Sequence, residues 1–176
     1  IFHFYTEFSE KEGENKRLAK ELETINLYFE NKLKTNMLFL TETEFISREN
    51  QLNRSGDIAR LIQELPSLLF GNLLDKSNFF YNLNEAEILT LFSCFNNIRV
   101  QDDQKRHSYK HIKTPENEKL CQEFENMDIE YNNLMHEYTR FMIKPGDLDP
   151  NYDILEYIIP WIKVENEGEC RLLLEN

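Results

Sequence analysis

The residues of this 176-residue chain that could do chemistry include an acidic run near its C-terminal end. Residues 147–153 read Asp-Leu-Asp-Pro-Asn-Tyr-Asp and begin like the calcium-binding loop of an EF-hand. That loop requires glycine at its sixth position and a bidentate glutamate at its twelfth. The chain has Tyr152 and Ile158 there, so we expect no calcium site.

The histidines, cysteines and serines do not have the spacing that a metal site or a catalytic nucleophile requires. His107 and His111 stand four residues apart, but neither has a cysteine at ligand spacing. Glu123 and Glu125 read as the surface of a helix and not as an acid/base pair, and no nucleophile motif surrounds a serine. The sequence therefore predicts no catalytic residue and no metal ligand.

The residues for nucleotide chemistry are also missing from the sequence. A phosphate-binding loop needs a lysine after a glycine, because backbone amides and the ammonium group neutralise the phosphates. None of the five glycines is followed by lysine, and no aspartate is followed by the glutamate of a DExH motif. We expect the chain alone to bind no cofactor and to hydrolyse no ATP.

One basic cluster interrupts a strongly acidic chain. The net charge is −12, from 32 acidic and 20 basic residues, so the surface as a whole should repel nucleic acid. The cluster lies in the polar segment 96–113 and contains Lys105, Arg106, His107, Lys110, His111 and Lys113. This segment is either a solvated loop or a local contact for phosphate or an acidic partner. The candidates for contact with nucleic acid are Lys105, Arg106, Lys110 and Lys113.

The composition favours helices as the elements that position these residues. Hydrophobic residues make up 40% of the chain and aromatic residues 12%, which suffices for a core. Five glycines and five prolines leave little room for the turns of a sandwich or barrel. We predict an all-α fold, a helical bundle forming one domain over residues 1–176, with two long amphipathic helices and several shorter ones.

The cysteines and the hydropathy of the chain indicate the kind of cellular compartment in which it occurs. Cys94, Cys121 and Cys170 are odd in number and widely spaced, which favours a reducing, intracellular compartment over a disulfide framework. Cys94 lies next to apolar positions and is predicted to be a core thiol. No apolar run approaches the roughly 20 residues that span a bilayer, so we expect no membrane segment.

The patterning divides the chain into four segments. These are a leading long helix (1–40), a central helical core (41–95), the polar basic loop (96–113) and the C-terminal helices (114–176). In the first segment, residues 1–8 would end an earlier helix and the long helix would begin near Glu14. Its apolar face contains Leu18, Leu22, Ile25 and Phe29.

Turn and cap signals place the shorter helices. Gly56 would permit either a close approach or an unusual backbone angle, and Pro66 should interrupt a short helix over residues 58–65. Asn84 and Glu87 are spaced as a capping box at the start of a central helix.

Prolines also mark the helices of the last segment. Pro115 stands at the first position of a second long helix, predicted over residues 116–143. Asp149-Pro150 should start a further helix whose apolar residues pack inward, Trp161 among them. A short helix is expected over residues 167–173.

Several short elements, taken in order, resemble a known family. The succession of Phe45-Ile46, of Leu52 with Gly56 and Ala59, and of Leu83 through Ser93-Cys94-Phe95 is similar to that in the C-terminal helical (DSHCT) domain of superkiller-type, exosome-assisting DExH RNA helicases. That family shows Gly-Phe-Ile/Val, Leu-x-x-x-Gly-Arg-x-Ala and Leu-Thr-x-Glu-x-x-x-x-Leu-Leu-Ser-Cys-Phe elements, followed by a helix with a tryptophan. The matching residues, which we expect to be architectural, are Phe45, Gly56, Ala59, Leu83, Ser93, Cys94, Phe95 and Trp161.

The resemblance implies a non-catalytic domain of an ATP-dependent RNA helicase, nuclear or cytoplasmic. In that family the domain packs on the motor domains and helps to form the channel for single-stranded RNA. ATP and Mg²⁺ would bind the motor domains in cis, and RNA and the protein partners of an RNA-processing complex would be reached through the assembled protein. The opening at Ile1, without methionine, is expected for a segment of a longer protein.

Two other hypotheses stay open. The chain is alternatively a stand-alone acidic helical module that binds a protein partner through an apolar face, without helicase activity. Asp57, which stands where the family carries a basic residue, favours this second hypothesis, whereas the ordered elements favour the first. A third hypothesis is an independent RNA contact by the segment Lys105–Lys113. The first hypothesis predicts that Phe95 and Trp161 are core residues whose truncation costs roughly 3–5 kcal/mol.

Overall fold

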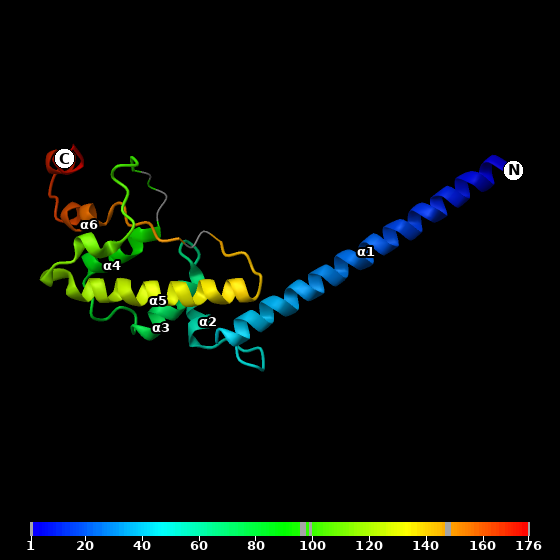
Figure 1. Ribbon diagram of the computed structural model, residues 1–176, viewed down its shortest axis with the longest axis horizontal. Coiled ribbons are helices and arrows are strands. Elements are labelled where there is room, and N and C mark those ends of the chain that lie inside the picture. Colours follow the sequence, from blue (N-terminus) through cyan, green and yellow to red (C-terminus); the bar gives the residue numbers. More distant parts are fainter. Residues whose placement is uncertain (1, 96–97, 99, 147–148, 176) are drawn as a thin grey trace.

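The computed structural model describes residues 2–95, 98, 100–146 and 149–175 (Figure 1). These residues form the α-helices α1 (Phe2–Glu42), α2 (Arg54–Ala59), α3 (Ser67–Lys76), α4 (Glu85–Phe92), α5 (Glu118–Arg140), α6 (Leu155–Ile162) and α7 (Glu167–Glu175). Short 3₁₀ turns lie at Ser93–Phe95, Tyr109–Ile112 and Pro115–Asn117. The predicted all-α bundle is confirmed, and within the described ranges the one strand-like pairing is an isolated bridge between Ile46 and Leu52.

α1 is one continuous helix of 41 residues that projects from the rest of the fold (Figure 1). The predicted break before Glu14 is therefore wrong. Residues 10–23 are mostly Glu, Lys, Arg, Leu and Ala, which favour a helix, and Gly13 inside it costs only about 1 kcal/mol relative to alanine. The last turns of α1 anchor it to the body. There the buried Phe39 stacks on Tyr138 with ring centroids 4.9 Å apart.

The chain reverses after α1 in a tight turn. The amide of Phe45 donates to the carbonyl of Leu40 at 2.9 Å, and the side-chain amide of Asn53 donates to the carbonyl of Glu44 at 2.8 Å. Glu44 and Asn50 both take positive φ angles, which narrow the turn. The turn returns the chain directly onto the end of α1.

The predicted helix over residues 58–65 is wrong, because α2 spans Arg54–Ala59. Gly56 lets the first turn of α2 lie against the backbone of Phe45, where a Cβ would overlap the Phe45 carbonyl oxygen. The predicted close approach at Gly56 is thus confirmed. After Ala59 the chain leaves the helix in turns, and Pro66 excludes the helical conformation from the residue before it.

The connection from α3 to α4 has an unusual backbone conformation, and it ends in a capping box at the start of α4. Asn78, Phe79 and Phe80 have positive φ angles of 51–60°, an uncommon run for residues other than glycine, and the turn buries Phe80 while Phe79 stays exposed. The predicted capping box follows. The Asn84 side chain accepts from the amide of Glu87 at 3.0 Å, and the Glu87 carboxylate accepts from the amide of Asn84 at 2.8 Å.

The predicted bounds of the C-terminal helices need correction. α5 is shorter than residues 116–143 because a 3₁₀ turn precedes Glu118 and because Met142 has a positive φ of 53°. α6 begins at Leu155 and not at Asp149-Pro150, since the amide of Asn151 donates to the carbonyl of Cys94 at 2.7 Å and holds this stretch as a loop. The predicted short helix is confirmed as α7.

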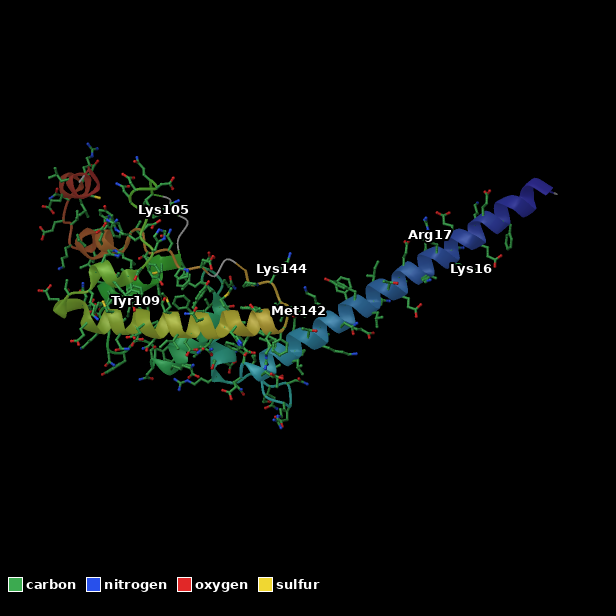
Figure 2. The ribbon with its side chains drawn as sticks, in the orientation of Figure 1. Lys16, Arg17, Lys105, Tyr109, Met142 and Lys144 are labelled. Carbon is green, nitrogen blue, oxygen red and sulfur yellow. The ribbon has the colours of Figure 1, made fainter. Side chains whose placement is uncertain are left out.

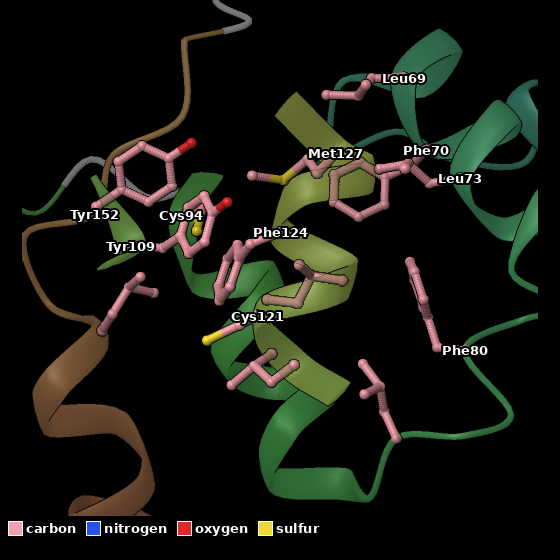
Figure 3. Close-up of a cluster of buried hydrophobic side chains, with 14 of the residues drawn as sticks. Leu69, Phe70, Leu73, Phe80, Cys94, Tyr109, Cys121, Phe124, Met127 and Tyr152 are labelled. Atoms are coloured by element: carbon pink, nitrogen blue, oxygen red, sulfur yellow. The ribbon is translucent and has the colours of Figure 1, made fainter. Parts of the chain in front are cut away.

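The core lies among α3, α4, α5 and the start of α6 (Figure 3). Side chains with almost no exposed surface fill it, among them Phe70, Leu91, Cys94, Leu120, Phe124 and Met127. Cys94 is a core thiol, as predicted. Burial, with a smaller contribution from Asp128, raises the pKa of its thiol, so Cys94 stays protonated near neutral pH. Within the described ranges, every helix is too short or too polar to cross a bilayer.

Alkaline pH is expected to weaken the tie between α5 and the segment before α6. The Tyr131 hydroxyl donates to Asp149 at 2.5 Å, and burial together with this hydrogen bond raises the pKa of Tyr131 to about 12. A tyrosine in the unfolded chain titrates near pH 10. The folded state therefore holds this proton more tightly, and its stabilising contribution should disappear between about pH 10 and 12.

Urea denaturation of the wild-type chain and of Tyr131→Phe at several alkaline pH values measures this contribution. The variant lacks the titrating hydroxyl, so its free energy of unfolding should fall less steeply with pH. Equal slopes for the two chains would show that Tyr131 is not the group responsible.

Candidate functional site

Two of the four basic candidates lie beside carboxylates. The backbone amide of Arg106 donates to Asp153 at 2.6 Å, and its guanidinium donates to Glu156 at 3.2 Å. Lys105 forms an ion pair with Asp102 at 2.5 Å. The contacts of Arg106 fasten the basic segment to α6, and the neighbouring carboxylates lower the positive potential available to phosphate.

The other two candidates follow a buried anchor in the chain. Lys110 and Lys113 are exposed, whereas Tyr109 is buried and stacks on Phe124 with ring centroids 5.1 Å apart. Figure 2 shows Lys105 and Tyr109 far from Lys16 and Arg17 of α1. The structure therefore gathers the candidates in one anchored segment, but it does not bring them together with the basic residues of α1.

The residues that imitate a calcium loop have structural partners. Asp149 accepts the Tyr131 hydroxyl, and Asp153 accepts the amide of Arg106, while Asp147 lies outside the described residues. His111 contacts the carbonyl of Ser108 through Nδ1, and His107 lies before the 3₁₀ turn, so the two histidines share no helix face. Among the described residues, no group of three or more His, Cys, Asp or Glu side chains could hold a metal ion.

Most residues that match the family elements lie in the interior. Phe45, Gly56, Ala59, Leu83 and Cys94 are buried. The partly buried Phe95 packs edge-on against Phe70 with ring centroids 5.1 Å apart, and Ser93 donates to the carbonyl of Thr90 at 2.7 Å. The side chains at these positions serve packing and turns.

Trp161 does not follow this pattern. Its side chain is 53% exposed, so the expectation that it is a core residue is wrong. Leu155, six residues earlier on α6, is the residue that enters the core, and Trp161 lies on a different face of the helix. The predicted loss of roughly 3–5 kcal/mol on truncation of Trp161 assumed that the side chain is buried, so that prediction no longer applies.

α1 carries a row of exposed apolar side chains, which we call the α1 stripe. Successive members are four, three, four and four residues apart, so they fall on one side of the helix, and each is 49–64% exposed. The stripe consists of Leu18, Leu22, Ile25, Phe29 and Leu33. Contiguous exposed apolar surface of this kind marks sites of interaction in folded proteins.

Two features could not be found, or were not found, from the sequence: one is the uncovered face of α1 and the other is a close contact in the interior. Sequence reasoning found the face of α1 but gave no sign that the body would leave the face uncovered. It also passed over Gly71, where a Cβ would lie 2.8 Å from the Cβ of Ala59 and 2.7 Å from the carbonyl oxygen of Ser55. A glycine inside the apolar segment Ser67–Lys76 was the available signal, because glycine disfavours a helix unless close packing requires it.

Comparison of the chain with protein-family models gives no match, and comparison with curated proteins gives none either.

Proposed function

We propose that the chain is a non-catalytic helical domain of an ATP-dependent RNA helicase, which packs on the motor domains and helps to form the channel for single-stranded RNA. One observation carries the proposal: two of the family-like elements, far apart in the sequence, both pack on α3. Gly71 of α3 receives Ala59, and Phe70 of α3 receives Phe92 and Phe95 edge-on at 5.3 and 5.1 Å.

This meeting point supports the proposal because each element alone is short and mostly apolar. The residues around Gly56 and those around Cys94 both contact α3, so these two elements belong to one packed unit. Their shared contact with α3 suits residues that specify one fold and hold a rigid wall. In the proposed assembly the motor domains bind ATP and Mg²⁺, and this chain supplies surface and not chemistry.

The proposed role predicts that the isolated chain binds single-stranded RNA weakly. Carboxylates accompany Lys105 and Arg106, and the net charge is −12, so the dissociation constant at physiological salt should be above about 10⁻⁵ M, as for non-specific binding. Fluorescence anisotropy with a labelled oligonucleotide measures it. Submicromolar binding that Lys110→Ala and Lys113→Ala remove would instead favour an independent RNA contact by the basic segment.

The natural polypeptide provides the direct test. Its intact mass in the source, together with RNA-stimulated ATP hydrolysis, separates a helicase from a free module. A mass far above the 21.2 kDa of this chain, with ATPase activity in the same polypeptide, is the expected result. A mass near 21.2 kDa without ATPase activity would reject the helicase proposal.

A second candidate function is a stand-alone module that binds a protein partner. The α1 stripe favours it, because five large apolar side chains on a projecting helix need a covering surface wherever the chain acts. A free module would show the small mass and would still bind a partner through α1.

A further inference from the structure

We propose that the projecting part of α1, residues 10–34, is a helical arm that forms and melts independently of the rest of the fold. We call this segment the arm and the remainder of the fold the body. The inference concerns the stability of α1 and does not depend on the helicase role, so either can fail alone.

Burial changes abruptly along α1, at the point where the arm ends. Every residue from Glu10 to Lys34 is exposed, whereas residues 35–37 are partly buried and Phe39 is buried. Figure 1 shows α1 leaving the body and continuing away from it. The body therefore removes little surface of the arm from water. Since packing against other elements supplies most of the stability of helices in folded proteins, the arm lacks the main source of that stability.

The contacts that anchor α1 follow the arm in the chain. Phe39 stacks on Tyr138 and meets Phe141 edge-on, with ring centroids 5.7 Å apart in the second pair. Glu42 forms an ion pair with Arg140. The helical hydrogen bonds of this last stretch reach only four residues back along the chain. The anchor can therefore stay in place while the arm melts.

The arm has local interactions of its own, and they are weak. Lys16 pairs with Glu12 at 2.7 Å and Arg17 pairs with Glu21 at 3.7 Å, each across one turn of the helix. Exposed pairs of this kind add little to helix stability, and Gly13 disfavours a helix. The arm should therefore exchange between helix and coil in water, and a surface that covered it would also order it.

Two optical probes separate the arm from the body. Trp161 of α6 is the only tryptophan in the sequence, so its fluorescence reports the body, whereas far-ultraviolet circular dichroism reports every helix. On heating the full 176-residue chain, the helical signal should start to fall gradually before the fluorescence transition begins. Coincident transitions would show one cooperative unit and overturn the proposal.

Hydrogen exchange locates the melting unit in the same chain. Amides of the arm should exchange less than about 100-fold slower than in an unfolded chain, and amides of α5 around Phe124 should be slowed by about 10³-fold or more. Equal protection of the arm and of α5 overturns the proposal. So does protection of the arm that rises with protein concentration, because a second copy would then order it.

Substitutions in the arm complete the test. Glu21→Pro should reduce the helical signal but leave the urea midpoint of Trp161 fluorescence unchanged, because it interrupts only the arm. Gly13→Ala should increase the helical signal and also leave that midpoint unchanged. Phe39→Ala is the matched control within α1, and it should lower the midpoint because it removes the buried anchor. A lower midpoint in Glu21→Pro would show that the arm supports the body and would overturn the proposal.

Discussion

Alanine in place of Gly56 is expected to lower the free energy of unfolding by about 3 kcal/mol or more, among the largest effects of any single substitution in this chain. The added Cβ would overlap the carbonyl oxygen of Phe45 and would lie 3.1 Å from a methyl group of Leu52. A backbone oxygen cannot rotate away as a side chain can. Relief therefore requires α2 to move away from the turn at Phe45, which also disturbs the packing of Ala59 on Gly71.

Gly13→Ala is the matched control, because a Cβ at Gly13 in α1 has open space around it. Alanine is the better helix former, so this change should raise or preserve stability, by up to about 1 kcal/mol. Urea denaturation of both variants measures the two free energies. If Gly56→Ala behaves like Gly13→Ala, α2 does not lie against Phe45 as described.

Local signals in the sequence predict much of this fold. The capping box at Asn84 and the close approach at Gly56 each depend on residues near one another in the chain, and each is found. The helix bounds are less predictable. The delayed start of α6 depends on a hydrogen bond from Asn151 to Cys94, more than fifty residues away in the chain. Periodicity cannot report contacts of that range.

The surfaces are harder to predict than the core, for a related reason. Spacing shows that Leu22 and Phe29 share a face, but it cannot show whether the body of the fold covers that face. Trp161 illustrates the reverse error, since a large apolar residue on a short apolar helix need not be the one that turns inward. The sequence presents Arg106 as a basic residue that could bind phosphate. In the structure it contacts Asp153 and Glu156 and so attaches the basic segment to α6.

The core residue Phe124 contributes to the stability of the fold and also contacts Tyr109 of the basic segment. It is fully buried, stacks on Tyr109 at 5.1 Å and meets Tyr152 edge-on at 6.2 Å (Figure 3). Phe124→Ala should therefore cost about 3–5 kcal/mol in free energy of unfolding, from lost burial and from the cavity left behind. Trp161→Ala is the control, and because the indole is more than half exposed it should cost less than about 1 kcal/mol.

Loss of Phe124 should also loosen the basic segment, because the ring of Tyr109 would lose its stacking partner while Lys110 stays exposed beside it. Limited trypsin digestion under native conditions measures this, and cleavage after Lys110 should be faster in Phe124→Ala than in wild type. Cleavage after Lys16, on the projecting α1, should not change and serves as the internal reference. If global stability falls but cleavage after Lys110 keeps its wild-type rate under native conditions, contacts other than the Tyr109 ring hold the segment. The ties from Arg106 to Asp153 and Glu156 would then be its main anchor.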